Sequence, residues 1–256
     1  MCAITRSINI EGFRGGDRTS LDLPQVQQNL ITSIQSIGKP VVLVLLNGSA
    51  LAVNWENENL PAIIETWYGG QAAGQAVADV LFGDYNPAGR LPVTFYKSVE
   101  DLPPFEDYAM DGRTYRYFKG EPLYAFGHGL SYTTFNYNNL KVKQQQQVND
   151  TMLLSAEVKI TGKIAGDEVV QVYLSHLNAT VPVPIRALVG FKRIHLLPGE
   201  IKTVKFSIPP AAFSIINNKN EREILPGEFG ISIGGRQPQG DPDSDSGILT
   251  ARINLQ

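Results

Sequence analysis

The sequence has very few of the residues that form disulfide bonds and metal sites. Of its 256 residues one is cysteine, Cys2, and three are histidine, and the histidines lie far apart at positions 128, 176 and 195. One cysteine cannot form an intrachain disulfide bond or a cysteine-based zinc site. The histidines do not have the spacing of metal ligands. We therefore expect no bound metal ion.

Charge and long apolar runs are also scarce. Charged residues make up 18% of the chain and the formal net charge is -3, so composition gives no electrostatic reason to expect nucleic acid or a membrane as partner. No apolar run approaches the ~20 residues of a membrane span, and the first residues lack the apolar stretch of a signal peptide. A hydrophobic share of 43% is typical of a globular protein, and the length allows one or two domains.

Residues 24–46 show a helical pattern followed by a strand pattern. Pro24 suits the first position of a helix, where its missing N–H has no partner to lose, and Gly38 suits a left-handed helix end. Between them apolar residues recur at helical spacing, namely Val26, Leu30, Ile31, Ile34 and Ile37. The uninterrupted apolar run 41–46 then predicts a strand inside a parallel sheet that helices cover on both faces.

The same alternation continues to residue 95. Residues 62–67 and 91–95 predict two more strands, and an apolar face over 72–81 predicts a helix that ends at Gly83. This order predicts a small doubly wound α/β layer of three strands with right-handed connections. We assign residues 1–95 to this partial α/β sandwich domain, a partial doubly wound sheet with flanking helices.

The rest of the chain reads as an aromatic-rich connector and an all-β domain. The connector, residues 96–130, is too aromatic for a free linker, and we expect it to pack across both domains. From residue 131 apolar residues alternate with polar ones, and Pro-Gly and Gly-Asp pairs mark the turns. About seven short strands predict a β-sandwich over residues 131–256. Without a Cys…Trp…Cys framework the sandwich is fibronectin type III-like rather than a true immunoglobulin domain.

Two familiar catalytic and nucleotide-binding patterns are absent. The glycine-rich loop 69–74 lacks the lysine and hydroxyl residue of a phosphate-binding loop, and its glycines are better explained by a tight strand-to-helix turn. Ser49 follows a strand but lacks the Gly-x-Ser-x-Gly context of an exposed nucleophile. His128, between two glycines, is interpreted as a turn residue.

Carboxylates in the loop 11–18 are better candidates for chemistry. The loop contains Glu11, Asp17 and two arginines just before the first helix. A carboxylate in such a loop serves as a general acid when its surroundings raise its pKa. We expect Asp17 and Arg18 to pair with each other or with neighbours and so to hold the loop. For Glu11 a catalytic and a structural role both stay open.

Several segments together resemble glycoside hydrolase family 3, and the resemblance covers nearly the whole chain from Glu11 onward. The most specific of them is residues 79–95, DVLFGDYNPAGRLPVTF. Upstream of it, the resemblance rests on Asp17-Arg18, Leu23-Pro24, the strand 41–46 with Asn47-Gly48-Ser49, and residues 67–71. Residues 115–118 and 124–135 resemble the segment that leads into the family's fibronectin-like domain. Residues 165–173 and 190–193 resemble that domain itself. The style of residues 11–18 is similar to the β-xylosidase and β-glucosidase branches.

The resemblance implies an enzyme of three parts, a (β/α) barrel, an α/β sandwich and a fibronectin-like domain. Such enzymes are retaining glycosidases that need no cofactor and use two carboxylates, about 5–5.5 Å apart. It further implies that the nucleophilic aspartate lies on the barrel, which needs about 250 residues and which we expect this chain to lack. Glu11 becomes the candidate for the acid/base residue, although Arg14-Gly15-Gly16 departs from the family's Glu-Gly-x-Asp-Arg spacing.

Our hypothesis is a C-terminal portion of a retaining β-glycosidase that acts on β-xylosides or β-glucosides and is inactive alone. The alternative is a non-catalytic module that binds carbohydrate through Trp67, Tyr115 and Tyr117, or that docks onto a separately encoded barrel. A third possibility is a chain without an independent function. We expect the parent enzyme to be secreted or periplasmic.

Overall fold

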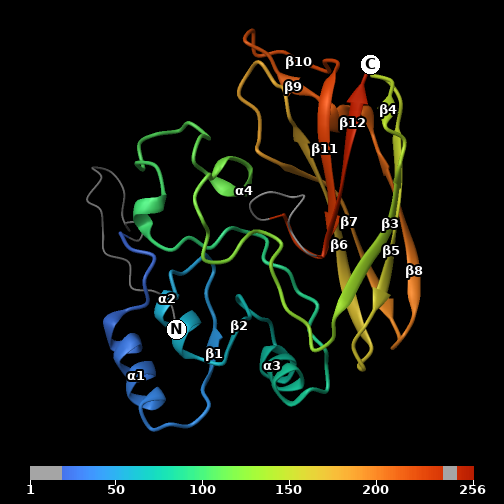
Figure 1. Ribbon diagram of the computed structural model, residues 1–256. Coiled ribbons are helices and arrows are strands. Elements are labelled where there is room, and N and C mark those ends of the chain that lie inside the picture. The colour runs from blue at the N-terminus through green and yellow to red at the C-terminus, as the bar shows by residue number, and fades with distance from the viewer. Residues whose placement is uncertain (1–18, 239–246) are drawn as a thin grey trace. The chain divides into compact units, whose positions relative to one another are not determined.

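The computed structural model describes residues 19–238 and 247–256, which form two compact units (Figure 1). Within the described part, unit 1 consists of residues up to Tyr85, Val93–Arg113 and Phe118–Ala125. Unit 2 consists of Asn86–Pro92, Thr114–Tyr117 and residues from Phe126 onward. The chain therefore passes between the two units several times within the aromatic-rich stretch, and each unit is described below by itself.

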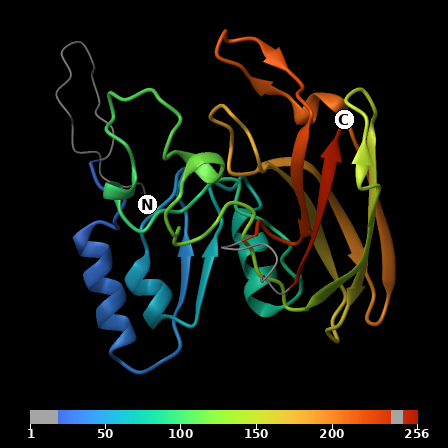
Figure 2. The ribbon, with the colours of Figure 1, turned by 45° about the horizontal axis from the view of Figure 1, so that its top comes forward.

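Unit 1 is built on two parallel strands. β1 (Val42–Leu45) pairs with β2 (Ala62–Glu65) in the register Val42 to Ala62, and Figure 2 shows the two arrows side by side. The two runs of mostly apolar, β-branched residues form these strands as predicted, but the expected cover on both faces is not found in the described part of the chain, where only Leu45 of the eight strand residues is buried. The accompanying elements are α1 (Gln25–Gln35), α2 (Asn54–Asn59), α3 (Ala73–Phe82) and the short 3-10 helix η1 (Val99–Asp101).

The structure corrects the expected third strand and adds a helix to the crossover. Among the described residues, 91–95 form no strand, and Phe95 makes only an isolated antiparallel bridge to Tyr124. α2 lies in the β1–β2 crossover, where no helix was expected, because Val53 before it is fully buried against Leu45 and Leu51. The predicted end of α3 is confirmed, since Gly83 caps it in the left-handed conformation with φ 85°.

The apolar face of α1 is exposed, in contrast to the expectation of a helix packed on a sheet. No residue of α1 is buried, and Val26 and Leu30 are 71% and 60% exposed. A two-stranded sheet offers a narrow surface, and two strands alone are marginally stable in water. The described part of unit 1 thus carries a helix whose apolar side no other described segment covers.

Unit 2 is a β-sandwich of two sheets, in which all neighbouring strands are antiparallel except β4 and β12. The five-stranded sheet has the order β4-β12-β11-β6-β7 and the other has the order β3-β5-β8. The strands of these sheets are β3 (Phe135–Val142), β4 (Gln145–Gln146), β5 (Met152–Ile160), β6 (Gly166–His176), β7 (Ala187–Leu196), β8 (Ile201–Ile208), β11 (Gly227–Gly234) and β12 (Ile248–Leu255). The unit also contains a small antiparallel pair of β9 (Ile215–Ile216) and β10 (Arg222–Glu223), the 3-10 helix η2 (Pro210–Phe213) and the helix α4 (Thr114–Tyr117).

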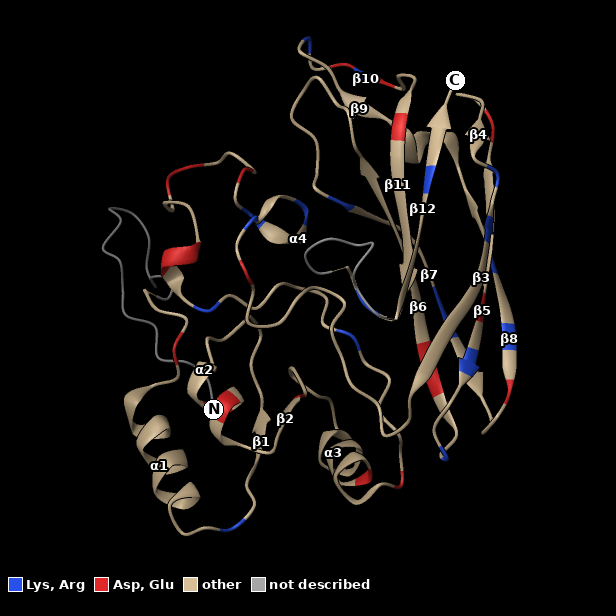
Figure 3. Cartoon of the chain, in the orientation of Figure 1, with Lys and Arg blue, Asp and Glu red and all other residues tan. Residues whose placement is uncertain are grey.

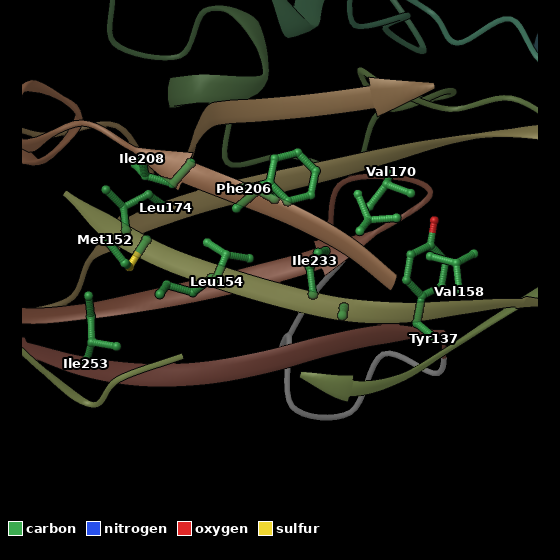
Figure 4. Close-up of a cluster of buried hydrophobic side chains, with 14 of the residues drawn as sticks. Tyr137, Met152, Leu154, Val158, Val170, Leu174, Phe206, Ile208, Ile233 and Ile253 are labelled. Carbon is green, nitrogen blue, oxygen red and sulfur yellow. The ribbon is translucent and has the colours of Figure 1, made fainter. Parts of the chain in front are cut away.

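The core of unit 2 follows the period-two pattern of its strands. Along β5, Met152, Leu154, Ala156, Val158 and Ile160 are buried, and the residues between them are exposed or half-buried. Figure 4 shows Leu154, Phe206 and Ile233 among side chains that gather between the strands of both sheets. Seven strands of eight or more residues produce this core, so the predicted α/β layer followed by a fibronectin-like sandwich is confirmed as the fold class.

A buried ion pair fastens residues 86–92 to the sandwich. The Nη2 of Arg90 donates to both carboxylate oxygens of Glu168 on β6, at 3.2 Å each, and Arg90 Nε donates to the carbonyl oxygen of Gly235 at 3.1 Å. The two side chains are 10% and 4% exposed. Burial raises the pKa of Glu168 and the charge of Arg90 opposes that rise, so Arg90 is the group that makes a buried carboxylate tolerable.

The two tryptophans, Trp55 and Trp67, both belong to unit 1, so their fluorescence follows the unfolding of that unit. We expect Leu30→Gln on α1 to change the free energy of unfolding by less than about 0.5 kcal/mol because Leu30 is exposed. Leu45→Ala, in the small core, should cost roughly 2–5 kcal/mol. Urea titrations measure both, and a cost above about 1 kcal/mol for Leu30→Gln would show that this chain covers the α1 face.

Arg90→Met should destabilise unit 2 by about 3–5 kcal/mol because Glu168 is left as an unpaired buried charge. The double variant Arg90→Met/Glu168→Met should recover most of that loss, since it removes the charge as well. Far-UV circular dichroism in urea measures the β-rich unit. Arg252→Met is the control, because its pair with Glu228 is exposed and is expected to contribute less than about 1 kcal/mol. A double variant as unstable as the single one would contradict this account.

Candidate functional site

The carboxyl ends of β1 and β2 bring three polar or aromatic residues together. Asn47 follows β1, Glu65 ends β2, and Trp67 lies two residues further on. Ligands of parallel α/β sheets bind outside the carboxyl ends of the strands. We call Asn47, Glu65 and Trp67 the strand-end cluster.

Hydrogen bonds to the Glu65 carboxylate hold the cluster together. Asn47 Nδ2 donates to Glu65 Oε2 at 3.1 Å and to the carbonyl oxygen of Ser49 at 2.7 Å. The backbone N–H of Trp67 donates to Glu65 Oε1 at 2.9 Å. Thr66 extends the ladder, since its N–H and its hydroxyl both donate to the carbonyl oxygen of Leu45. Both oxygens of Glu65 are therefore engaged in fixing the two strand ends.

Trp67 adopts a backbone conformation that is unfavourable for a bulky residue. Its φ is 53°, in the left-handed region, where a non-glycine residue needs compensation from its surroundings. The hydrogen bond to Glu65 and an edge-to-face contact with the buried ring of Phe95, 6.2 Å between centroids, supply it. The half-buried indole is held by these contacts at the strand ends. Backbone strain of this kind is concentrated at functional sites.

The cluster contains an acceptor without a partner and a carboxyl with a shifted pKa. Asn47 is 8% exposed, and its Oδ1 has no hydrogen-bond partner among the described residues. Burial raises the pKa of Glu65, and the hydrogen bonds from Trp67 and Asn47 limit the rise. A buried free acceptor beside a carboxyl of raised pKa can receive a hydrogen bond from a ligand hydroxyl.

A second buried carboxylate lies on α2. Glu56 is 1% exposed, and its Oε1 has no hydrogen-bond partner among the described residues. Its neighbour Asn57 accepts a hydrogen bond from the Tyr124 hydroxyl at 2.7 Å, and Tyr124 packs edge-to-face on Phe95, 6.0 Å between centroids. Burial and the charge of Glu56 raise the pKa of Tyr124. The aromatic row Trp67, Phe95 and Tyr124 thus connects the strand-end cluster to the surroundings of Glu56.

The structure places the residues proposed from sequence in different settings. Glu11 lies outside the described residues. Trp67 belongs to the strand-end cluster. Tyr115 and Tyr117 belong to α4 in unit 2, where the Tyr115 ring stacks on Phe126 at 4.1 Å between centroids and its hydroxyl accepts a hydrogen bond from the N–H of Leu188 at 3.1 Å. Sugar binding by Trp67, Tyr115 and Tyr117, and catalysis by Glu11, stay predictions.

Sequence reasoning passed over Asn47, Glu56 and Glu65. A usable signal existed for two of them, because a polar residue directly after an apolar parallel strand lies at the edge where ligands bind. Glu56 had no such signal, since its burial depends on packing around α2. Among residues 19–238 and 247–256, no three His, Cys, Asp or Glu side chains are placed to hold a metal ion. None of the described helices is long and apolar enough to span a membrane.

Comparison with known proteins assigns the chain to a family. The glycosyl hydrolase family 3 C-terminal domain matches residues 2–132, and a fibronectin type III-like domain matches residues 168–237. The chain belongs to glycosyl hydrolase family 3. Two catalogued relatives are a beta-xylosidase from Formosa agariphila, 45% identical over 233 residues, and a periplasmic beta-glucosidase from Salmonella typhimurium, 42% identical over 230 residues.

Coverage is nearly complete for this chain and partial for its relatives. The match to the Formosa enzyme covers 89% of this chain and 32% of that protein, and the match to the Salmonella enzyme covers 85% and 30%. A solved β-glucosidase from Erythrobacter marinus superposes with a TM-score of 0.83 at 34% identity, over 100% of this chain and 34% of that one. The chain thus spans about a third of the length of these relatives, and it corresponds to a C-terminal portion of a family 3 enzyme.

The pKa of Glu65 provides a test of the cluster. Asn47→Ala removes a hydrogen bond to the charged carboxylate, so we expect the pKa of Glu65, already above its usual value, to rise further. Carboxyl-carbon NMR titration measures it, with Asn59→Ala on α2 as the control. In the unchanged chain the carboxyl of Glu65 holds its proton more tightly in the folded state than in the unfolded state. Unit 1 should therefore lose stability as the pH rises from about 4, the pKa of an unfolded glutamate, through the higher pKa of Glu65 in the folded state. A fall of the pKa in Asn47→Ala would contradict the assigned hydrogen bond.

Proposed function

We propose that this chain is the C-terminal part of a retaining β-glycosidase that hydrolyses β-xylosides or β-glucosides. The observation that carries the proposal is identity above 40% to a beta-xylosidase, a xylan 1,4-beta-xylosidase from Xylanibacter ruminicola and a periplasmic beta-glucosidase, each matched over 85% or more of this chain. The strand-end cluster supports it, because a buried free acceptor and a fixed indole suit a ligand rich in hydroxyl groups.

Retention requires two carboxylates about 5–5.5 Å apart, one as nucleophile and one as acid and base. In our proposal Glu11 is the acid/base residue, which protonates the leaving oxygen and then activates water. We assign the nucleophilic aspartate to the barrel that the family resemblance implies and that this chain, which spans about a third of the length of its relatives, is proposed to lack. The cluster acts as the support of this site, with Trp67 as an aromatic surface for a sugar ring. Each of the two parts supplies one carboxylate, so neither part completes the double displacement alone.

A non-catalytic role as a sugar-binding module is the second candidate. It is favoured by the left-handed backbone of Trp67, because backbone strain of this kind is concentrated at ligand-binding sites as well as catalytic ones. The two roles share the same residues and differ in whether a barrel completes the site. We also propose that the parent enzyme works outside the cytoplasm, in line with its similarity to the periplasmic beta-glucosidase from Salmonella typhimurium.

The isolated chain should release no nitrophenol from 4-nitrophenyl β-xyloside or β-glucoside above the buffer rate. Mixing it with the part of the Xylanibacter relative that this chain does not match, about three-quarters of that protein, should produce turnover, because the second carboxylate is then supplied. Glu11→Gln should abolish that turnover, whereas Glu106→Gln should leave it unchanged. Trp67→Ala should raise KM more than it lowers kcat. Turnover by the chain alone that Glu11→Gln removes would contradict the proposal.

A further inference from the structure

The outer face of the β3-β5-β8 sheet carries a groove lined by lysines. It has a volume of about 670 Å³ and is open to solvent. Its polar and apolar lining includes Lys141, Lys143, Leu153, Ser155, Lys205 and Ser207. We call these six residues the lysine groove. Lysines also lie elsewhere along this sheet, and blue segments mark β3, β5 and β8 in Figure 3.

Strand register places two of the lysines on either side of one serine. Ser155 on β5 is paired with Lys141 on β3 and with Lys205 on β8. These three residues therefore form one row across the sheet, with the lysine backbones two strand spacings, about 10 Å, apart. Val142, Leu154 and Phe206 form the adjacent row, which faces the core, so the Lys141 row faces outward. Two flexible ammonium groups can converge on an anionic group above Ser155.

A β-bulge creates this row. The register of β3 against β5 shifts between Asn138 and Lys141, and Asn139 within the shift has a left-handed φ of 54°. Without the shift, Lys141 would be displaced from its place opposite Ser155. Bulges redirect side chains and are found beside functional sites. The bulge is therefore the element that brings Lys141 into line with Lys205.

The groove has positive charge without internal neutralisation. Lys141, Lys143 and Lys205 form no ion pair with any described residue. Lys192 on β7 does not line this groove, since it lies over the ring of the core-facing Phe206 and donates to the carbonyl oxygen of Lys205. Glu157, two residues along β5 from Ser155, is on the same face and accepts a hydrogen bond from Asn139 at 2.7 Å. The local field thus differs in sign from the net charge of -3.

We propose that the lysine groove binds a polysaccharide chain that bears carboxylates, with one carboxylate held between Lys141 and Lys205. Leu153, 66% exposed and paired with Ser207, provides an apolar surface for the carbon–hydrogen face of a sugar ring. The serine hydroxyls provide partners for ring hydroxyls. An open groove suits an extended chain better than a small molecule, which is usually enclosed. That the anion belongs to a saccharide rests on the proposed function.

Isothermal titration calorimetry of the full chain tests the proposal with three probes of defined chemistry. These are a xylo-oligosaccharide with glucuronic acid side groups, the neutral xylo-oligosaccharide of the same length, and inorganic phosphate. We expect binding of the acidic oligosaccharide alone, weakening as salt is raised. Equal binding of the neutral probe, phosphate binding as tight as that of the acidic oligosaccharide, or no binding of the acidic probe at millimolar concentration would overturn the proposal.

Variants assign the binding to the groove. Lys141→Gln/Lys205→Gln should weaken it roughly tenfold, and Lys141→Arg/Lys205→Arg should retain it. Lys159→Gln/Lys163→Gln removes the same charge outside the groove and should have no effect; an equal loss there would overturn the assignment. Circular dichroism checks that all variants fold. The nitrophenyl glycoside assay needs no acidic side group, so its outcome is independent of the groove.

Discussion

The ion pair between Arg90 and Glu168 is the interaction on which the arrangement of unit 2 depends. Arg90 comes from a segment far upstream of the sandwich in sequence, and its guanidinium joins that segment to β6 and to the carbonyl oxygen of Gly235 after β11. Gln171 reinforces the same place by donating to the carbonyl oxygens of Gly235 and Gly127. A buried charge pair tolerates little displacement, because each charge is costly without the other. It therefore specifies where residues 86–92 and 126–128 run.

The two units differ in how completely they bury their apolar residues. Unit 2 closes a core between two sheets, whereas α1 and α3 of unit 1 contain no buried residue. The reason is geometric, since a sheet of two strands has neither the width nor the second layer to cover an amphipathic helix. This contrast agrees with a chain that spans about a third of the length of its relatives. A parallel α/β layer gains its stability from further strands and helices.

The candidate site is also a product of that layer. Glu65 uses both carboxylate oxygens to join the ends of β1 and β2, and in doing so it holds Trp67 at a positive φ. The strand-end cluster thus combines a structural role with the features of a binding site. The lysine groove is a different kind of surface, built from cross-strand register rather than from strand ends, and it carries the opposite charge.

The sequence by itself determined the class of the protein and most of its elements. Local signals were sufficient for β1, β2, α3 and the sandwich strands, because apolar periodicity and turn residues act over a few positions, and the run 79–95 carried the family resemblance. The exposed face of α1, the missing strand at 91–95, the burial of Glu56 and the pairing of Arg90 with Glu168 were decided only by the tertiary structure. Each depends on which residues far apart in sequence meet, and a buried charge or an uncovered face has no local pattern that reveals it. The row of Lys141, Ser155 and Lys205 belongs with these, since a bulge of one register step determines which side chains share a face.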